Sequence, residues 1–312
     1  MPDILIAFFV LGLLAGMIRS DLALSGGAHD LIGIMLMMAI GLKGGMAMSG
    51  QLHPDMLVTV VTVLALGFTV PLICYAALRG VARIDGANSA SLAAHYGSVS
   101  AGTFAIALAY AERHNLTLSP DTTLHLVLLE VPAIIVGVLL YKYQGGATGT
   151  TASVIREAVT GRGVVLMVGG LLLGLFYGEA GADKIVPLFI ALFPGFLALF
   201  LLEAGISTAK YLRQWHPGYW RLVGFALLAP PVLALIGLSA ALALDMPAGS
   251  AVVLATLLAS ASYIAAPAAV RHAMPQANVG MALFAALGVT FPFNVLIGIP
   301  LYNAAFQWLA RL

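Results

Sequence analysis

The sequence predicts an all-α polytopic membrane protein, and three observations support this fold class. Of its 312 residues, 61% are hydrophobic and only 9% are charged. Apolar stretches of about 20 residues, the length at which a helix crosses a bilayer, recur along the whole chain. These stretches are too long and too continuous for barrel strands, and a backbone in lipid must satisfy its own hydrogen bonds. A bundle of membrane-spanning helices is therefore expected.

Charged residues and Pro/Gly-rich breaks divide the chain into ten expected spans. The first span has no basic region before it and no clear cleavage site after it, so we interpret it as a retained helix and not as a signal peptide. The single cysteine, Cys74, lies inside the third span, which excludes a disulfide framework. In order, the expected spans are 3–19, 29–49, 55–78, 89–112, 121–142, 162–178, 184–210, 218–244, 248–272 and 279–310.

The basic residues in the turns predict how the bundle is oriented. Ten of them fall on one side of the expected spans and three on the other, which places both termini outside the cytoplasm. The longest connection, 143–161, is rich in Gly, Thr and Ser and is expected to be a cytoplasmic linker. It separates a first five-helix unit, 1–142, from a second, 162–312.

The two halves of the chain match each other at a nearly constant offset, which predicts an internal repeat. His53-Pro54 falls on His216-Pro217 at an offset of 163 residues, and "GSVSAGTF" (97–104) falls on "SASYIAAP" (260–267) at the same offset. Because each half holds five spans, an odd number, the second copy enters the membrane from the opposite side. Two further pairs match at nearly this offset: "LGLLAG" (11–16) with "GGLLLG" (169–174), and "EVPAIIVGVLLY" (130–141) with "TFPFNVLIGIPL" (290–301).

Small and hydroxylated residues interrupt the fourth and ninth spans near their middles. Runs of this kind in membrane helices allow neighbouring backbones to approach closely, and packing is one interpretation. The other is that both helices break there, so that free N–H groups and positive dipole ends converge on a small anion. The repeat-equivalent positions favour the second interpretation. The expected substrate-binding residues are Gly97, Ser98, Val99, Ser100, Thr103, Ser260, Ala261, Ser262 and Tyr263.

Three ionisable residues, Lys43, Glu130 and Glu203, lie within expected spans or close to their ends, where burying a charge requires a reason. Snorkelling toward the outer interface is the alternative to a functional role for Lys43. Glu130 and Glu203 are either neutral hydrogen-bonded carboxyls, ion-pair partners of Lys43, or groups that ligate a cation or carry a proton. We predict a cation-binding or coupling role for at least one of the three.

Several enzyme and metal patterns are absent from the sequence. There is no Walker loop, no HExxH and no defensible Ser-His-Asp arrangement, so neither an ATP-driven pump nor an intramembrane hydrolase is supported. We therefore expect no enzyme activity, no catalytic residue, no organic cofactor and no nucleic-acid partner. His95 precedes the first break and is interpreted as structural. The methionine-rich run at 34–48 is interpreted as packing and not as a soft-metal site.

Six segments, in this order and spacing, form a specific pattern over nearly the whole chain: "IGLKGGMAM" (40–48), "YGSVSAGTFAIAL" (96–108), "LEVPAIIV" (129–136), "LEAGIS" (202–207), "LASASYIAAPAAVRHAMPQAN" (258–278) and "GVTFPFNVLIGIPLY" (288–302). These segments resemble the sodium-dependent bicarbonate permeases of bacteria, the Sbt family. The resemblance implies ten spans in two inverted five-helix repeats, a core and a gate domain, a homotrimer, and sodium-driven uptake by an elevator-like motion in the bacterial inner membrane. It also implies that bicarbonate sits between the breaks of spans four and nine.

The chain departs from the cyanobacterial members of this family at the ninth span. Tyr263 stands where those members have an acid that resembles a sodium ligand, and Ala265 and Ala266 replace a Ser-Gly pair. A phenol carries no charge at neutral pH, so a sodium ion here would need Glu203, Glu130 and neutral oxygens as ligands. The linker is also shorter than in those members, although the resemblance implies regulation by a PII-like cytosolic protein.

Three functions remain open at the level of the sequence. The first is sodium-coupled uptake of a small monovalent anion, with bicarbonate implied by the resemblance. The second is a proton-coupled or uncoupled carrier of another small carboxylate, motivated by Tyr263 in place of an acid. The third is a membrane sensor that binds the anion without transporting it.

Overall fold

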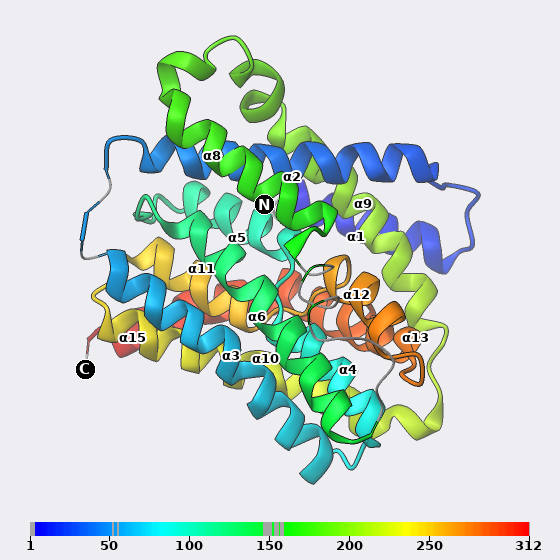
Figure 1. Ribbon diagram of the computed structural model, residues 1–312. Helices are drawn as coiled ribbons and strands as arrows, with labels where there is room; N and C mark the ends of the chain where they lie inside the picture. Colours follow the sequence, from blue (N-terminus) through cyan, green and yellow to red (C-terminus); the bar gives the residue numbers. More distant parts are fainter. Residues whose placement is uncertain are drawn as a thin grey trace.

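Figure 1 shows the computed structural model of the protein, which describes residues 4–51, 53, 54, 56–145, 152, 156 and 159–311. These residues form helices and connecting turns, and no strand occurs among them. Within these described residues, eight helical segments are long and apolar enough to cross a membrane, and two shorter apolar helices, Ile4–Met17 and Ala248–Leu258, accompany them. The prediction of an all-helical, multi-pass membrane protein is confirmed.

The helices follow the expected spans closely. Of the predicted linker, 143–161, more than half lies outside the described residues. In chain order the elements are α1 (Ile4–Met17), α2 (Gly26–Met48), α3 (Met56–Gly80), α4 (Gly86–Gly97), α5 (Ala101–Arg113), α6 (Thr122–Tyr143), α8 (Arg162–Ala182), η1 (Pro187–Ala191), α9 (Phe193–Leu212), η2 (Pro217–Tyr219), α10 (Trp220–Ala243), α11 (Ala248–Leu258), α12 (Ala265–Ala273), α13 (Val279–Leu283), η3 (Phe284–Thr290), α14 (Phe291–Phe293), η4 (Asn294–Gly298) and α15 (Ile299–Leu309).

Some local features differ from the expected spans for a clear physical reason. Helix α2 begins three residues earlier than predicted, because the Ser25 side chain caps it by accepting a hydrogen bond from the Ala28 N–H group (3.3 Å). The last span is one continuous helical path, but it contains the wide π turns η3 and η4. Each lies just before a proline, Pro292 or Pro300, whose ring and missing N–H group disturb the preceding turn.

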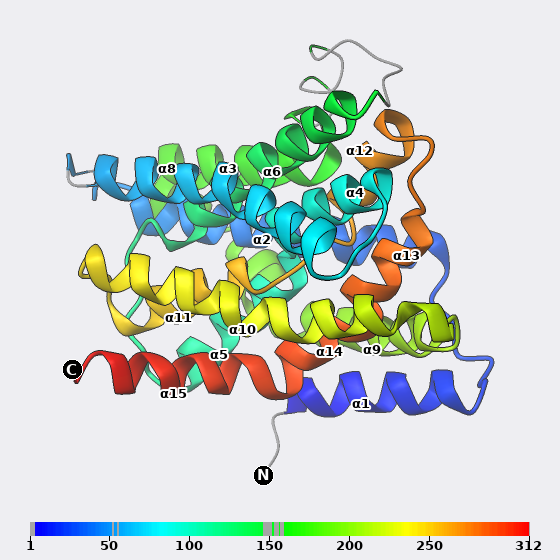
Figure 2. The same cartoon turned by 90° about the horizontal axis from the view of Figure 1, so that it is seen from below.

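Two pairs of helices cross through glycines that bring their backbones together. Helices α2 and α8 pack along each other at one face of the bundle (Figure 1), and α1 packs along α9 (Figure 2). A Cβ atom at Gly170 of α8 would lie 2.8 Å from the carbonyl oxygen of Met38 in α2, and a Cβ atom at Gly41 of α2 would lie closer still to the Met167 carbonyl oxygen of α8. Gly12 of α1 and Gly205 of α9 make the corresponding close contacts. Side chains larger than hydrogen do not fit at these crossings.

The interrupted spans pack with the remaining helices in two groups. Helices α3, α4 and α6 pack against one another, as do α10, α11 and the segments of the last span. Helix α5 packs on α11, which joins the two groups at the centre of the protein. The core side chains at the contact between α5 and α11, including Phe104 and Leu254, are fully buried. The interrupted spans therefore lie in the interior, where backbone N–H and C=O groups freed at a helix break require hydrogen-bond partners.

Candidate functional site

Both interrupted spans are broken helices. Helix α4 ends at Gly97 and α5 begins at Ala101, and the intervening Ser98 and Ser100 have extended backbones (φ −81°, ψ 175° and φ −105°, ψ 115°). Helix α11 ends at Leu258 and α12 begins at Ala265. In each case the chain leaves the helix at the Gly, Ser and Ala residues that interrupt the apolar pattern.

The two breaks are in direct contact. The backbone N–H group of Ser100 donates a hydrogen bond to the side-chain oxygen of Ser260 (3.0 Å). The N–H group of Ser262 donates one to the backbone carbonyl of His95 (2.7 Å). Because each break supplies a partner for the other, the two form a single structural unit, which we call the break junction (residues 95–103 and 260–266).

Two helix N-termini begin at the break junction and are capped by its serines. The Ser100 hydroxyl oxygen accepts hydrogen bonds from the N–H group (3.1 Å) and the hydroxyl (2.9 Å) of Thr103. The Ser262 hydroxyl oxygen accepts one from the N–H group of Ala266 in α12 (3.1 Å). A capped helix start still has further N–H groups with no acceptor in its own helix, and it carries a partial positive charge. The starts of α5 and α12 therefore each contribute a partial positive charge to the junction, which contains no lysine or arginine.

Unpaired buried polar groups gather along one face of α4 toward the junction. Ser91, His95 and Ser98 are spaced by four and three residues, so they share this face. Their atoms Ser91 Oγ, His95 Nε2 and Ser98 Oγ are buried without a hydrogen-bond partner, as is the hydroxyl of Tyr263. Buried polar atoms in native proteins nearly always have partners, so this group is suited to a polar ligand. The sequence pattern indicates a structural role for His95 and gives no signal for Ser91.

The other predicted substrate-binding residues shape the junction. Gly97 lies against Pro71 of α3, where a Cβ atom would be 2.6 Å from the proline ring. Val99 and Ala261 are buried. The Tyr263 ring stacks on Phe200 (centroids 6.3 Å apart) and meets Phe291 edge-on (5.5 Å). These contacts hold the phenol at the edge of the junction.

A polar cavity of about 330 Å³ borders the junction at Tyr263. It lies between α2, α9 and α12 and is lined by ionisable and hydroxyl side chains, including Glu203, Tyr211 and Arg271. Within it, His29 Nδ1 lies 3.2 Å from a Glu203 carboxylate oxygen, and the Ser207 hydroxyl donates to the other oxygen (2.9 Å). Neither His29 nor Arg271 is among the site residues predicted from the sequence. Both fall inside expected spans, 29–49 and 248–272, where an ionisable side chain is itself a signal.

The structure does not bring Lys43, Glu130 and Glu203 together. Lys43 of α2 forms an ion pair with Glu112 of α5, and Glu203 pairs with His29. Glu130 is buried in α6, and one of its carboxylate oxygens has no hydrogen-bond partner. No cluster of three or more His, Cys, Asp or Glu side chains among the described residues is arranged to hold a metal ion.

We expect the Lys43→Gln substitution to change the free energy of unfolding by less than about 1 kcal/mol. Both side chains of the Lys43–Glu112 pair are close to half-exposed (41% and 47%), so solvent weakens the attraction between them. Thermal unfolding of the purified protein measures this change, with Glu112→Gln as the matched variant. A loss of stability several times larger would show that the pair holds α2 and α5 together.

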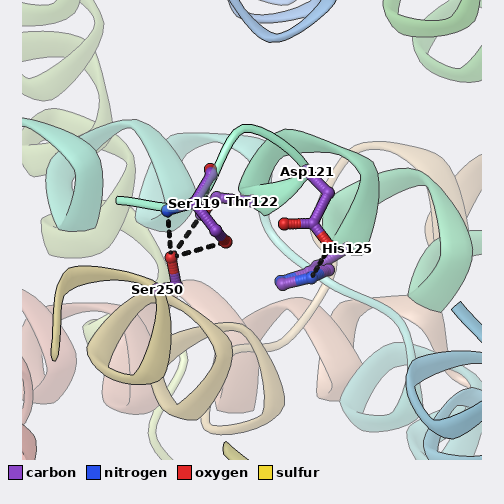
Figure 3. Close-up of polar contacts among 5 residues, drawn as sticks. All are labelled: Ser119, Asp121, Thr122, His125 and Ser250. Carbon is purple, nitrogen blue, oxygen red and sulfur yellow. Dashed lines mark hydrogen bonds and ion pairs between the residues drawn. The ribbon is translucent and has the colours of Figure 1, made fainter. Parts of the chain in front are cut away.

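A second polar cluster lies at the start of α6 (Figure 3). The Ser250 hydroxyl oxygen accepts a hydrogen bond from the Ser119 N–H group (2.7 Å) and lies within hydrogen-bond distance of the hydroxyls of Ser119 (2.9 Å) and Thr122 (2.7 Å). Beside them, His125 Nε2 lies 3.7 Å from Asp121 Oδ2. This cluster fastens the first turn of α11 to the loop that precedes α6.

A multi-pass helical protein whose broken helices meet in the interior has the architecture typical of secondary transporters. The comparison of the sequence with protein families agrees. Residues 4–307 match the Na⁺-dependent bicarbonate transporter superfamily, and the chain belongs to this family. No curated protein matches the chain in sequence. The resemblance noted from the motifs is thus confirmed, and membership of a transporter family favours transport over catalysis.

Proposed function

We propose that this protein is a secondary transporter that takes up bicarbonate together with sodium, and that the anion binds at the break junction. The observation that carries this proposal is the direct contact of the two breaks, in which the Ser100 N–H group bonds to Ser260. This contact directs two helix N-termini toward one region, where a small anion is stabilised.

The chemistry of the junction suits an anion that must also be released. The hydroxyls of Ser98 and Tyr263 are buried and unpaired, so they are available to donate to a bound anion. Ser100, Thr103 and Ser262 are occupied in capping, and they fix the backbone around these donors. Neutral donors and helix ends attract a monovalent anion less strongly than an arginine would, which favours turnover over permanent binding.

Equivalent contacts in the two halves support an inverted repeat. The Ser250 hydroxyl in the first turn of α11 accepts a hydrogen bond from the Ser119 N–H group (2.7 Å). The Asn88 side chain in the first turn of α4 accepts one from the Asn278 N–H group (2.7 Å). Each contact ties the start of one broken span to the loop that follows the other broken span. The glycine crossings of α1 with α9 and of α2 with α8 are likewise exchanged by the repeat.

These packing relations also support an elevator mechanism. Helices α1, α2, α8 and α9 form the two glycine crossings, and we assign them to the gate. The helices around the break junction form the core, which would move past the gate with the anion. The homotrimer, the PII-like regulator, the inner-membrane location and the outward-facing termini remain predictions.

A proton is the second candidate for the driving ion, and two observations favour considering it. Tyr263 supplies no carboxylate, and the carboxyl group of Glu130 has an unpaired oxygen in the interior. The His29–Glu203 pair in the cavity beside the junction is a further group that can exchange protons. For sodium, the available ligands are the carboxylates of Glu203 and Glu130 and neighbouring hydroxyl or carbonyl oxygens.

Uptake of radiolabelled bicarbonate into proteoliposomes tests the proposed function. We expect uptake that rises when a sodium gradient is imposed inward. Uptake that follows a pH gradient and ignores sodium would assign the coupling to protons. Absence of uptake of any small anion under either gradient would overturn transport. Bicarbonate-dependent thermal stabilisation without flux would then indicate a sensor.

We expect Glu203→Gln to remove most of the stimulation by the coupling ion while leaving binding of the anion largely intact. The substitution keeps the shape of the side chain but removes the negative charge of the carboxylate. That carboxylate pairs with His29 and accepts a hydrogen bond from the Ser207 hydroxyl. The ratio of uptake with and without the gradient measures this effect. Glu179→Gln, at an exposed position near the end of α8, is the matched control and should keep the ratio of the parent. An unchanged ratio in Glu203→Gln would exclude Glu203 from coupling.

A further inference from the structure

A long apolar groove lies between α3 and α10, away from the break junction. Its volume is about 410 Å³. Cys74 and Ala77 contribute to one wall, and Gly224 and Leu228 to the other. Cys74 is buried at the side of this groove. The groove borders two helices that carry many exposed apolar side chains, so its surroundings are suited to lipid.

One end of the groove is cationic and aromatic. Among the described residues, Arg221 is the one charged residue that lines it, and its guanidinium group lies 5.1 Å from the centre of the Trp220 ring. On the opposite wall, Val81 and Ala82 line the groove, and the exposed Arg83 follows them directly. Arg79, in the last turn of α3, donates a hydrogen bond to the Ile84 carbonyl (2.7 Å). Tryptophan and arginine at the end of an apolar surface are typical of the level of lipid headgroups. Clustered arginines there attract anionic lipids.

The groove is connected to the break junction through one aromatic contact. Phe225 lines the groove and meets Tyr96 edge-on, with ring centroids 4.9 Å apart. Tyr96 lies two residues before Ser98, and its hydroxyl forms a hydrogen bond with Thr290 (2.7 Å). A molecule in the groove therefore contacts Phe225, whose ring packs against Tyr96 near the end of α4.

We propose that this groove binds an anionic glycerophospholipid, with an acyl chain between α3 and α10 and the phosphate at Arg221. A second copy of the chain is the competing occupant, and the charge distribution disfavours it. Copies related by an axis along the membrane normal place the same end of each groove at the same depth. The arginines of both copies would then face each other, whereas a phospholipid neutralises them.

Trp220 provides a reporter for the lipid. In a variant carrying Trp215→Phe and Trp308→Phe, Trp220 is the remaining tryptophan, and brominated lipids quench its fluorescence on contact. In vesicles of phosphatidylcholine, we expect brominated phosphatidylglycerol to associate about fivefold more strongly than brominated phosphatidylcholine. Arg221→Gln should remove this preference. Arg311→Gln, at a position outside the groove near the C-terminus, should leave the preference unchanged.

A second pair of variants tests the groove itself. A Cβ atom at Gly224 meets nothing within 4 Å, so Gly224→Leu extends into the groove without a clash and should reduce quenching by both lipids. Gly169→Leu on α8, where the space is equally open, is the control. Equal quenching by the two lipids in the parent, or quenching unaffected by Gly224→Leu, would overturn the proposal. A second copy in the groove would exclude both lipids and leave Trp220 poorly quenched. These outcomes do not depend on whether the protein transports bicarbonate.

Discussion

Ser260→Ala is expected to reduce bicarbonate uptake about tenfold or more while the protein remains folded. The substitution removes the oxygen that accepts a hydrogen bond from the Ser100 N–H group and leaves that buried group unpaired. An unpaired buried N–H group costs about 1–3 kcal/mol, and this cost applies only while the two breaks are in contact. The fraction of molecules with an assembled junction falls accordingly, and the apparent affinity for the anion falls with it.

The matched control for this prediction is Thr256→Ala in the same helix. The Thr256 hydroxyl is buried, like that of Ser260, but it donates only to the carbonyl of Val252 one turn earlier (2.7 Å). Its removal leaves no N–H group without a partner, so uptake should stay close to that of the parent. Initial rates over a range of bicarbonate concentrations separate a loss of affinity from a loss of maximal rate. Equal uptake in the two variants would show that contact between the breaks is not required.

Gly170→Leu is expected to prevent stable folding, or to lower the free energy of unfolding by about 3 kcal/mol or more. At Gly170, a Cβ atom would be 2.8 Å from the carbonyl oxygen of Met38 and 3.0 Å from the amide nitrogen of Leu42. Both are backbone atoms of α2 and cannot move aside as a flexible side chain does. Helices α2 and α8 would have to separate along their length, which loses the dispersion contacts that hold helices together in lipid.

The neighbouring glycine provides the control. At Gly169, a Cβ atom meets nothing within 4 Å, so Gly169→Leu should leave the unfolding temperature and the yield of monodisperse protein close to those of the parent. The two variants differ by one position and have the same composition. If Gly170→Leu were as stable as Gly169→Leu, the close crossing of α2 and α8 would be wrong, and with it the assignment of these helices to a rigid gate.

The positions of the helix breaks were predictable from the sequence, because Gly, Ser and Thr in an apolar run provide both a local signal and a repeat-related match. Ser100 and Ser260 illustrate this. Each is a polar residue within an apolar span, and the two lie 160 residues apart, near the repeat offset. The hydrogen bond between them, however, depends on the tertiary structure. The sequence predicted that the two breaks converge, but not which groups would pair and which would remain unpaired.

The pairing of ionisable residues was not predictable to the same degree. Lys43 has glycine neighbours that indicate a special environment, but its partner Glu112 lies near the end of another helix. The partner of Glu203 is His29, whose place in α2 depends on the cap at Ser25. Such pairs depend on how the helices rotate and cross, and the apolar pattern of a membrane helix contains little information about rotation because lipid and protein interior are both apolar.

The central claim is that the anion binds at the break junction. The most direct measurement is an experimental structure determined with saturating bicarbonate and sodium. We predict density for a planar anion between residues 97–103 and 260–263, within hydrogen-bond distance of the Ser98 hydroxyl and the N–H groups that begin α5. The same experiment on Ser260→Ala should show this density weakened. Anion density confined to the cavity beside Glu203 and Arg271, with the junction empty, would contradict the claim.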